Sequence, residues 1–244
     1  MATMRAGSIA YGSKVRENLH LEIIPNLSCR DRNLLALQSE IIGADILGHN
    51  NLFIITGDTP MYSEGFKPVW EVNSIELCGI VKGLNDGIAS VRGSEKVIDG
   101  STKFTIGGAL IFGRSNEQET LRKKVDVGFD YFISQISFDA EEAEGFFAEA
   151  EERGDRVDRH VQIGLSPTST LRRLRTISQM PGIKIRKTTL EKLDQSPDFI
   201  ESVVTHLTGV VDDLKSSLST YSIGFHLMPI GSDEATHRLV EELT

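Results

Sequence analysis

The chain has 244 residues, of which 39% are hydrophobic and 25% are charged, and its formal net charge is −9. This composition is ordinary for a soluble globular protein and excludes a disordered chain. The acidic balance, without any Lys/Arg cluster interleaved with aromatic residues, argues against a nucleic-acid partner. We expect a single domain that covers residues 1–244.

The cysteine content and the apolar runs set the expected compartment. Cys29 and Cys78 are the only cysteines, and they lack the spacing of a zinc or redox motif. Two reduced thiols in a cytoplasmic protein are therefore expected. No apolar run approaches the ~18 residues that a membrane span requires, and the N-terminus lacks the apolar core of a secretion signal. No membrane association is predicted.

Short apolar runs alternate along the chain with amphipathic segments. Near-continuous apolarity predicts strands that are covered on both faces, at residues 22–29, 52–58, 103–113, 131–139, 160–167 and 221–231. Helical spacing predicts helices at residues 4–19, 32–48, 74–88, 117–128, 140–154 and 198–218.

This alternation predicts an α/β fold of parallel βαβ units, either an open doubly wound sheet or a TIM-type (β/α)8 barrel. Polar residues follow successive strands, among them Ser28, Asp58, Asp139 and Ser166. Functional groups collect at that face of such barrels, which favours the barrel. Six strands are visible, whereas a full barrel has eight.

Two of the predicted helices carry further detail. Ser74 is a plausible N-cap for the helix that starts there. In the acidic run of residues 140–159, the carboxylates lie opposite Phe146, Phe147 and Ala150, which indicates a solvated helix face.

The stretch LFIITGDTP places a carboxylate, Asp58, directly after an apolar strand and Gly57, with Pro60 close behind. A carboxylate there can accept hydrogen bonds from a ligand or tune the charge of a bound ring. The alternative is that Asp58 only caps the next turn.

Gln135 and a glycine pair lie inside predicted strands. An amide that faces a barrel interior can read a heterocycle by donating and accepting at once, although Gln135 could also pair only with backbone. Gly107 and Gly108 permit the close approach of a backbone or a flat ligand, or they mark a bulge.

Three basic side chains complete the candidates. Lys123 and Lys124 lie early on a helix, within reach of a phosphate at the barrel rim, but both could be solvated surface residues. His226 is expected to pack with its nitrogens satisfied by backbone rather than to bind a metal. No other residues have ligand spacing, so no metal site is predicted.

Five segments occur in an order that resembles the methylenetetrahydrofolate reductase family, the flavin-dependent barrels that reduce methylenetetrahydrofolate to methyltetrahydrofolate. The segments are IPNLSCRDRN, ITGDTP, LRKKVDVGFDYFISQISFD, GLSPTSTLRRL and FHLMPIGSDEA. The resemblance implies a TIM barrel, FAD as cofactor, NADH or NADPH as hydride donor, and a folate or related pterin as substrate.

The resemblance also implies roles for individual residues. Asp58 and Gln135 would be the catalytic residues, and Gln135 and Leu171 would contact the substrate. The residues implied in flavin binding are Asn26, Ile55, Thr56, Gly57, Asp58, Gly107, Gly108, Lys123 and Lys124.

The chain departs from the family at several positions. Asn26 and Ser28 stand where the family often has His and Thr, and Leu171 stands where the family has a Phe that packs on nicotinamide or folate. Near Ala109 a flavin-side aromatic residue is replaced, and Ser232 occupies a position that is sometimes Arg. Cofactor or substrate contacts are therefore expected to differ from those of the family.

Family members begin with two further strands, the first carrying a glutamate that acts as general acid, whereas this chain opens at the helix that follows them. We therefore expect a homo-oligomer or a hetero-oligomer in which another chain covers the exposed strand edges. The alternative function is a non-catalytic or partner-dependent folate- or flavin-binding subunit, for example in a methyl-transfer or demethylation pathway.

Overall fold

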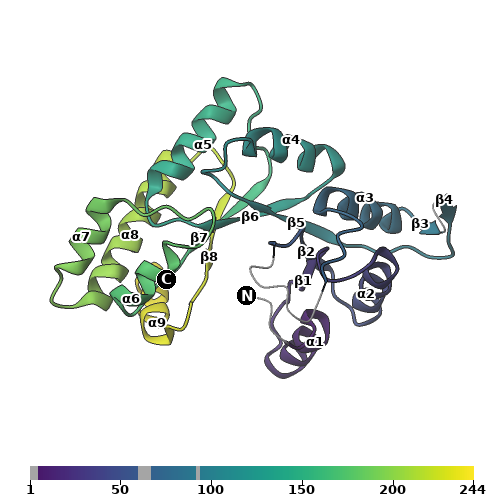
Figure 1. Ribbon diagram of the computed structural model, residues 1–244, viewed down its shortest axis with the longest axis horizontal. Helices are drawn as coiled ribbons and strands as arrows, with labels where there is room; N and C mark the ends of the chain where they lie inside the picture. The colour runs from purple at the N-terminus through teal and green to yellow at the C-terminus, as the bar shows by residue number, and fades with distance from the viewer. Residues whose placement is uncertain (1–4, 60–66, 92–93) are drawn as a thin grey trace. The chain divides into compact units, whose positions relative to one another are not determined.

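The computed structural model describes residues 5–59, 67–91 and 94–244. Figure 1 shows its helices, which are α1 (Ser8–Leu19), α2 (Leu34–Ile46), α3 (Ser74–Asn85), α4 (Glu117–Val127), α5 (Ala140–Glu152), α6 (Leu171–Ile177), α7 (Lys187–Asp194), α8 (Phe199–Ser217) and α9 (Asp233–Leu243). The strands are β1 (Asn26–Ser28), β2 (Asn51–Ile55), β3 (Ile88–Val91), β4 (Ser94–Val97), β5 (Thr105–Leu110), β6 (Tyr131–Ile136), β7 (His160–Leu165) and β8 (Ile223–Leu227).

Six strands form a parallel sheet in the order β1-β2-β5-β6-β7-β8. Five of them fall inside a strand that the sequence predicts, and β2 begins at Asn51, one residue before the strand predicted at residues 52–58. Helices alternate with these strands as in an α/β barrel. The strand order follows the chain order, as expected for successive right-handed βαβ units. The predicted α/β architecture is therefore confirmed for the described residues.

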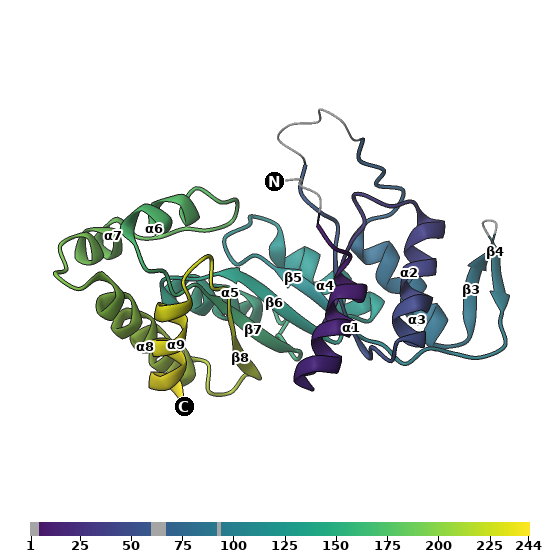
Figure 2. The ribbon, with the colours of Figure 1, turned by 90° about the horizontal axis from the view of Figure 1, so that it is seen from below.

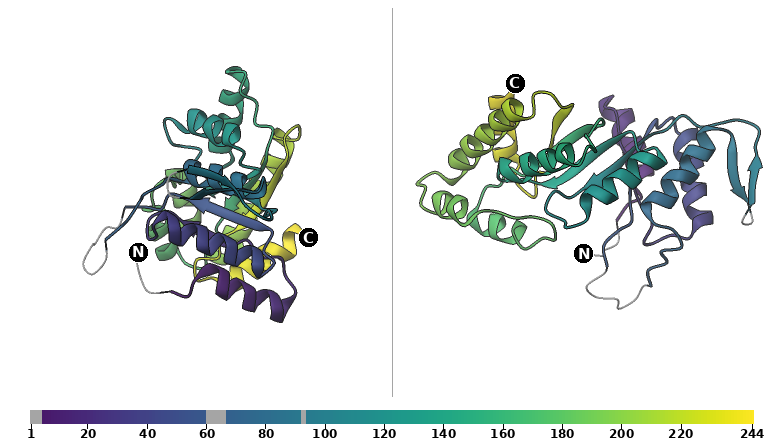
Figure 3. Two further views of the ribbon diagram at one scale, coloured as in Figure 1. Left: turned by 90° about the vertical axis from the view of Figure 1, so that its right-hand side faces the viewer. Right: turned by 90° about the horizontal axis from the view of Figure 1, so that it is seen from above.

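The hairpin of β3 and β4 was not predicted. These strands pair antiparallel, with Ile88 opposite Val97, and form a separate two-stranded sheet beyond α3 (Figures 2 and 3). Its second strand is fully exposed, with the Val97 side chain 89% accessible. Hydrophobic periodicity fails to detect this hairpin because neither face of β4 is buried.

The chain forms two compact units. The first comprises Met1–Ala109 with Lys123–Tyr131, and the second comprises Leu110–Arg122 with Phe132–Thr244. The single domain over residues 1–244 stays a prediction. No helix in the described ranges is both long enough and apolar enough to cross a membrane.

The core of the first unit lies between its strands and helices α2 and α3. In β2, Leu52 and Ile54 are buried, whereas Phe53 and Ile55, which alternate with them, are only half-buried. The prediction that the strands are buried on both faces is therefore wrong for β2. It is also wrong for β8, in which every side chain is half-buried. Alternate residues point to opposite faces of a strand, so one face of β2 is buried and the other, which carries Phe53 and Ile55, is only partly covered.

Asn73, rather than Ser74, is the N-cap of α3. Its side-chain oxygen accepts from the backbone N–H groups of Ile75 and Glu76, and the Glu76 carboxylate accepts in return from the Asn73 N–H, at 2.8 Å. This reciprocal pair is a capping box, which is typically worth about 1 kcal/mol. Ser74 is the first helical residue.

In the second unit, α8 packs against α5, α7 and α9. The apolar face of α5 buries Phe146, Phe147 and Ala150, as the sequence predicts. Phe112 and Tyr221 join the two phenylalanines in an aromatic cluster, with ring centroids 5.3 Å apart for Phe112–Phe146 and 4.7 Å apart for Phe147–Tyr221.

Three helices of this unit, α6, α7 and α9, were not predicted. The first two have only 7 and 8 residues, too few for helical periodicity to stand out. At the other end of the chain, the helix predicted at residues 4–19 is present as α1 but begins only at Ser8, because residues 5–7 are not helical. Met4 lies outside the described residues.

Candidate functional site

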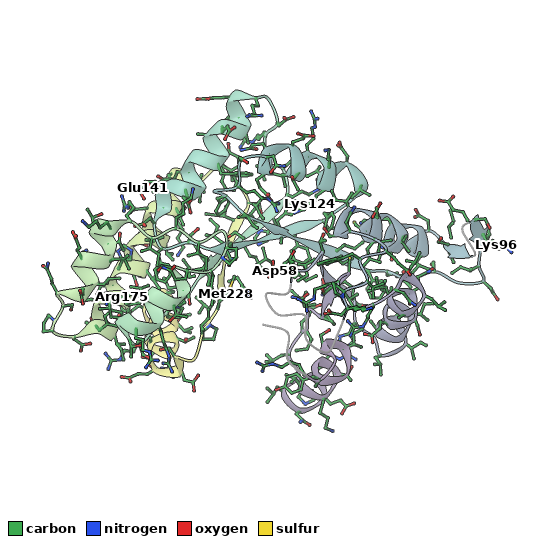
Figure 4. All side chains as sticks on the ribbon, viewed as in Figure 1. Asp58, Lys96, Lys124, Glu141, Arg175 and Met228 are labelled. Carbon is green, nitrogen blue, oxygen red and sulfur yellow. The ribbon has the colours of Figure 1, made fainter. Side chains whose placement is uncertain are left out.

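In the first unit, β1 and β2 end side by side, because Ser28 pairs with Ile55 in their parallel register. Gly57 then adopts a φ of +92°, and a Cβ atom there would lie 2.5 Å from Ser28 Oγ and 2.8 Å from Arg30 Cβ. Both the conformation and the space therefore require glycine at this position. The turn leaves Asp58 exposed at the carboxyl end of β2 (Figure 4).

Arg30 holds the segment that carries Asp58. Its guanidinium donates from Nη1 to the Asp58 carbonyl oxygen at 3.3 Å. It also forms a bidentate pair with Asp31, at 2.7 Å from Nε to Oδ1 and 2.8 Å from Nη2 to Oδ2. The hydrogen bonds of this pair raise the pKa of Arg30 and lower the pKa of Asp31. Arg30 thus keeps a positive charge beside the Asp58 backbone.

Sequence reasoning missed this role of Arg30. The signal was present, since the residue belongs to the segment IPNLSCRDRN. Pro60, which follows Asp58 closely in the sequence, lies outside the described residues.

The hydroxyl of Thr56 is used within the fold. It accepts from the Ser74 backbone N–H and donates to Ser74 Oγ, each at 3.1 Å. These bonds tie the end of β2 to the first residue of α3. Ile55 is half-buried and Asn26 is exposed, and the Asn26 backbone carbonyl accepts from Ser8 Oγ at 2.7 Å.

Gly107 and Gly108 lie in β5, opposite Phe53 and Ile54 of β2. The space beside Gly107 is filled, because a Cβ atom there would lie 2.3 Å from Tyr131 Cζ. A buried tyrosine ring therefore fills the space on this side of the strand, and the approach of a flat ligand to Gly107 stays a prediction. Burial raises the pKa of Tyr131 to about 12, so the ring stays neutral.

Lys123 and Lys124 differ in their surroundings. The Lys124 side chain is buried and its ammonium group donates to the Ala109 carbonyl oxygen, at the carboxyl end of β5 (Figure 4). Lys123 is exposed on α4. Of the predicted pair, only Lys124 is directed at a strand end, where an ammonium group suits a phosphate.

Gln135 in the second unit is half-buried near the end of β6. Its Nε2 donates to the Pro181 carbonyl oxygen at 3.1 Å, and its Oε1 accepts from the Ile136 backbone N–H at 3.0 Å. A carboxamide has two N–H donors and two acceptor lone pairs, so one of each remains for a ligand. Gln135 can therefore pair with backbone, as predicted, and still form hydrogen bonds with a heterocyclic ligand.

Two further residues follow β7 in this unit. Leu171 is the first residue of α6 and is half-buried. Thr168 is fully buried, and its hydroxyl has no hydrogen-bond partner in the described part of the chain. The buried hydroxyl of Ser232, just before α9, is likewise unpaired among the described residues.

The Asp139 carboxylate forms hydrogen bonds within the protein. Its carboxylate accepts from the Arg186 backbone N–H at 3.0 Å and from Thr189 Oγ1 at 2.7 Å, which anchors the start of α7. Burial opposes its ionisation, but these hydrogen bonds and the Arg186 guanidinium outweigh burial and lower its pKa.

His226 does not have the backbone partners that were predicted for it. Its ring is half-buried on the β8 face, and none of the described residues hydrogen-bonds to it. Burial lowers its pKa, which favours the neutral ring. The described residues also contain no group of three His, Cys, Asp or Glu side chains placed to hold a metal.

A flavin-binding site needs accessible backbone beside the flavin ring and positively charged side chains beside the phosphates of the nucleotide. In the first unit, Gly57 supplies the backbone and Lys124 supplies an ammonium group at the carboxyl end of β5. Arg30 adds a second cation next to Asp58. The chemistry of this donor set is compatible with a flavin nucleotide.

Comparison with known proteins assigns the fold and the family. The family model described as methylenetetrahydrofolate reductase matches residues 1–244. A solved structure is similar over 89% of this chain and 91% of its own chain, with a TM-score of 0.53 and 15% identity. It is an uncharacterized protein from Clostridium thermocellum that binds two copies of 5-methyl-5,6,7,8-tetrahydrofolic acid. No curated protein matches the chain. The TIM-barrel class and the family predicted from the sequence are confirmed.

Proposed function

Since the chain belongs to the methylenetetrahydrofolate reductase family, we propose that it is an oxidoreductase of one-carbon metabolism. It reduces 5,10-methylenetetrahydrofolate to 5-methyltetrahydrofolate, with FAD as cofactor and NADH or NADPH as hydride donor. The family match over residues 1–244 is the observation that carries this proposal. The methyltetrahydrofolate bound by the Clostridium thermocellum protein supports a folate as ligand.

Asp58 is the proposed catalytic carboxylate. It is exposed at the end of β2, on a turn that only glycine at position 57 can form. A negative charge there favours a cationic iminium form of the folate, which is the form that accepts hydride. Arg30, through its bond to the Asp58 carbonyl oxygen, keeps the backbone of this turn in place.

Gln135 is proposed to contact the folate as well. Its internal hydrogen bonds leave one N–H group and one oxygen lone pair of the amide unused. The N–H group can donate a hydrogen bond to one edge of a pterin, and the oxygen can accept one from the same edge. Leu171, half-buried at the start of α6, offers apolar surface for the same ligand.

FAD, when bound, supplies the hydride chemistry. The proposed binding residues on β1 and β2 are Asn26, Ile55, Thr56, Gly57 and Asp58, and those on β5 and α4 are Gly107, Gly108, Lys123 and Lys124. Lys124 has the strongest support, because its buried ammonium group is directed at the end of β5. Gly107 can contribute only backbone, since the Tyr131 ring occupies the space beside it.

The oligomeric state and the compartment belong to the same proposal. Strands β1 and β8 each have a single neighbour in the six-stranded sheet. Unpaired strand edges favour association, so we expect a second copy or another chain to cover them. Sedimentation analysis that found a stable monomer would contradict this expectation. The free, buried thiols of Cys29 and Cys78 fit a cytoplasmic protein.

Flavin reconstitution tests the proposed cofactor. The protein is mixed with FAD, dialysed, and its visible absorption spectrum is recorded together with its circular dichroism. We expect retained oxidised flavin that NADH or NADPH bleaches under anaerobic conditions. A well-folded protein that stays colourless would overturn the proposal and would leave a folate-binding subunit as the remaining function.

A further inference from the structure

The orientation of the Gln135 side chain is fixed by two backbone groups of opposite character. The Pro181 carbonyl oxygen can only accept, so the atom 3.1 Å from it must be the amide nitrogen. The Ile136 N–H can only donate, so the atom 3.0 Å from it must be the amide oxygen. A flipped amide would break both hydrogen bonds at once.

The Pro181 carbonyl belongs to a tight turn at residues 180–183. The Ile183 backbone N–H donates to the Met180 carbonyl oxygen at 3.2 Å, and Gly182 has a φ of +78°. Proline at the second position and glycine with positive φ at the third position define a type II β-turn. A type I turn of the same residues would turn the central peptide over. The Pro181 carbonyl would then point away from Gln135.

The side-chain direction of Gly182 faces Ile111 and Gln135. A Cβ atom at this position would lie 3.7 Å from Gln135 Cγ and 2.8 Å from Ile111 Cγ2. Ile111 follows β5, Gln135 is the next-to-last residue of β6, and the turn follows α6. The turn therefore packs on the stem of Gln135 and holds its amide at the same time.

We propose that the type II turn at residues 180–183 is the positioning device for Gln135, with Gly182 as the positioning residue that acts through it. The turn decides which edge of the amide donates and which accepts, and so it selects ligands that offer an acceptor and a donor in the matching order. This inference rests on the proposed folate function, in which Gln135 contacts the pterin.

A double-mutant cycle tests the coupling. Binding of 5-methyltetrahydrofolate to the flavin-loaded protein is measured by calorimetry for wild type, Gly182→Ala, Gln135→Ala and the double variant. Each single change should weaken binding roughly 3- to 10-fold, the value of one neutral hydrogen bond. In the Gln135→Ala background, Gly182→Ala should add less than about 2-fold. Additive losses would show that Gly182 has no role through Gln135 and would overturn the proposal.

Two matched variants separate the turn from crowding and from general stability. Gly182→Asn places the same Cβ against Ile111, but asparagine tolerates positive φ, so it should bind more tightly than Gly182→Ala. Gly209→Ala, whose Cβ meets nothing within 4 Å, should bind like wild type. Equal losses in the Ala and Asn variants at position 182 would contradict a role of the turn type.

A second readout does not depend on folate. The side-chain amide signals of Gln135, assigned by their loss in Gln135→Ala, are followed by nitrogen-resolved NMR. Slow exchange with solvent is expected in wild type and Gly182→Asn, and faster exchange is expected in Gly182→Ala. If wild type fails to bind 5-methyltetrahydrofolate, the proposed function fails, and this measurement still decides the positioning role. Unchanged exchange in Gly182→Ala would overturn it.

Discussion

The Tyr131 ring occupies the space that a side chain at Gly107 would fill, with Cζ 2.3 Å from the position of a Cβ atom. Gly107 is the third residue of β5, and Tyr131 is the first residue of the neighbouring strand β6. The Tyr131 hydroxyl reaches the Leu52 carbonyl oxygen at 3.5 Å. Glycine at position 107 therefore makes room for a buried tyrosine of the same chain. This relationship can be tested by mutation.

Gly107→Ala should destabilise the protein by at least ~2 kcal/mol, because an added methyl group in a filled core forces the ring or the backbone to move. Gly145→Ala is the matched control, since its Cβ would meet nothing within 4 Å inside α5. That control should be neutral or stabilising by up to ~1 kcal/mol. Urea unfolding measures both changes. Equal free energies of unfolding for Gly107→Ala and wild type would contradict the packing described.

Lys124→Met should weaken FAD binding by roughly 10-fold or more, because each charge-assisted phosphate contact contributes about 1.5 to 3 kcal/mol. Methionine keeps the apolar stem, so the fold should persist. Lys123→Met is the comparison, and it should weaken FAD binding less than Lys124→Met does, because Lys123 is exposed on α4. Fluorescence titration with FAD measures both. If Lys123→Met had the larger effect, the choice between the two lysines would be wrong.

Asp58→Asn should slow the reduction of folate by about 100-fold while the reduction of flavin by the nicotinamide changes much less. The amide keeps the shape of the side chain and loses the charge that favours the iminium form of the substrate. Stopped-flow measurement of the two half-reactions separates these effects. Similar slowing in both would remove Asp58 from its proposed role.

Acidification should destabilise the first unit through His49. The ring is buried, its Nε2 lies 2.8 Å from Ser13 Oγ, and burial together with the charge of Arg16 lowers its pKa. Unfolding returns the pKa to about 6.5, so the unfolded state binds the proton first and stability falls as pH drops below ~6.5. The half-buried His226 acts in the same direction.

Urea unfolding at a pH above and a pH below this value measures the effect. His49→Gln should reduce the loss of stability on acidification. The same pH dependence in His49→Gln and wild type would show that other groups cause it.

Strands and helices were predictable from the sequence where the residues that define them are close together along the chain. The apolar runs located all six strands of the parallel sheet, and the Gly-Asp pair after β2 located the exposed carboxylate at position 58. The β3–β4 hairpin escaped detection because β4 buries nothing.

The partners of the site residues were not predictable, because distant segments supply them. The Tyr131 ring fills the space beside Gly107, and the Gln135 amide hydrogen-bonds to the Pro181 carbonyl oxygen. Periodicity states which face a residue occupies but not what fills the space opposite. Asp139 illustrates the same limit, since its position after a strand suggested a ligand and its actual partners lie at the start of α7.

Single-turnover reduction of the folate tests the central claim most directly. The FAD-loaded protein is reduced with NADH or NADPH under anaerobic conditions and mixed with 5,10-methylenetetrahydrofolate, while the visible absorption of oxidised flavin is followed. The account predicts that this absorption returns and that an equivalent amount of 5-methyltetrahydrofolate forms. Reduced flavin that stays reduced in the presence of the folate, in a protein that retains its cofactor, would contradict the account.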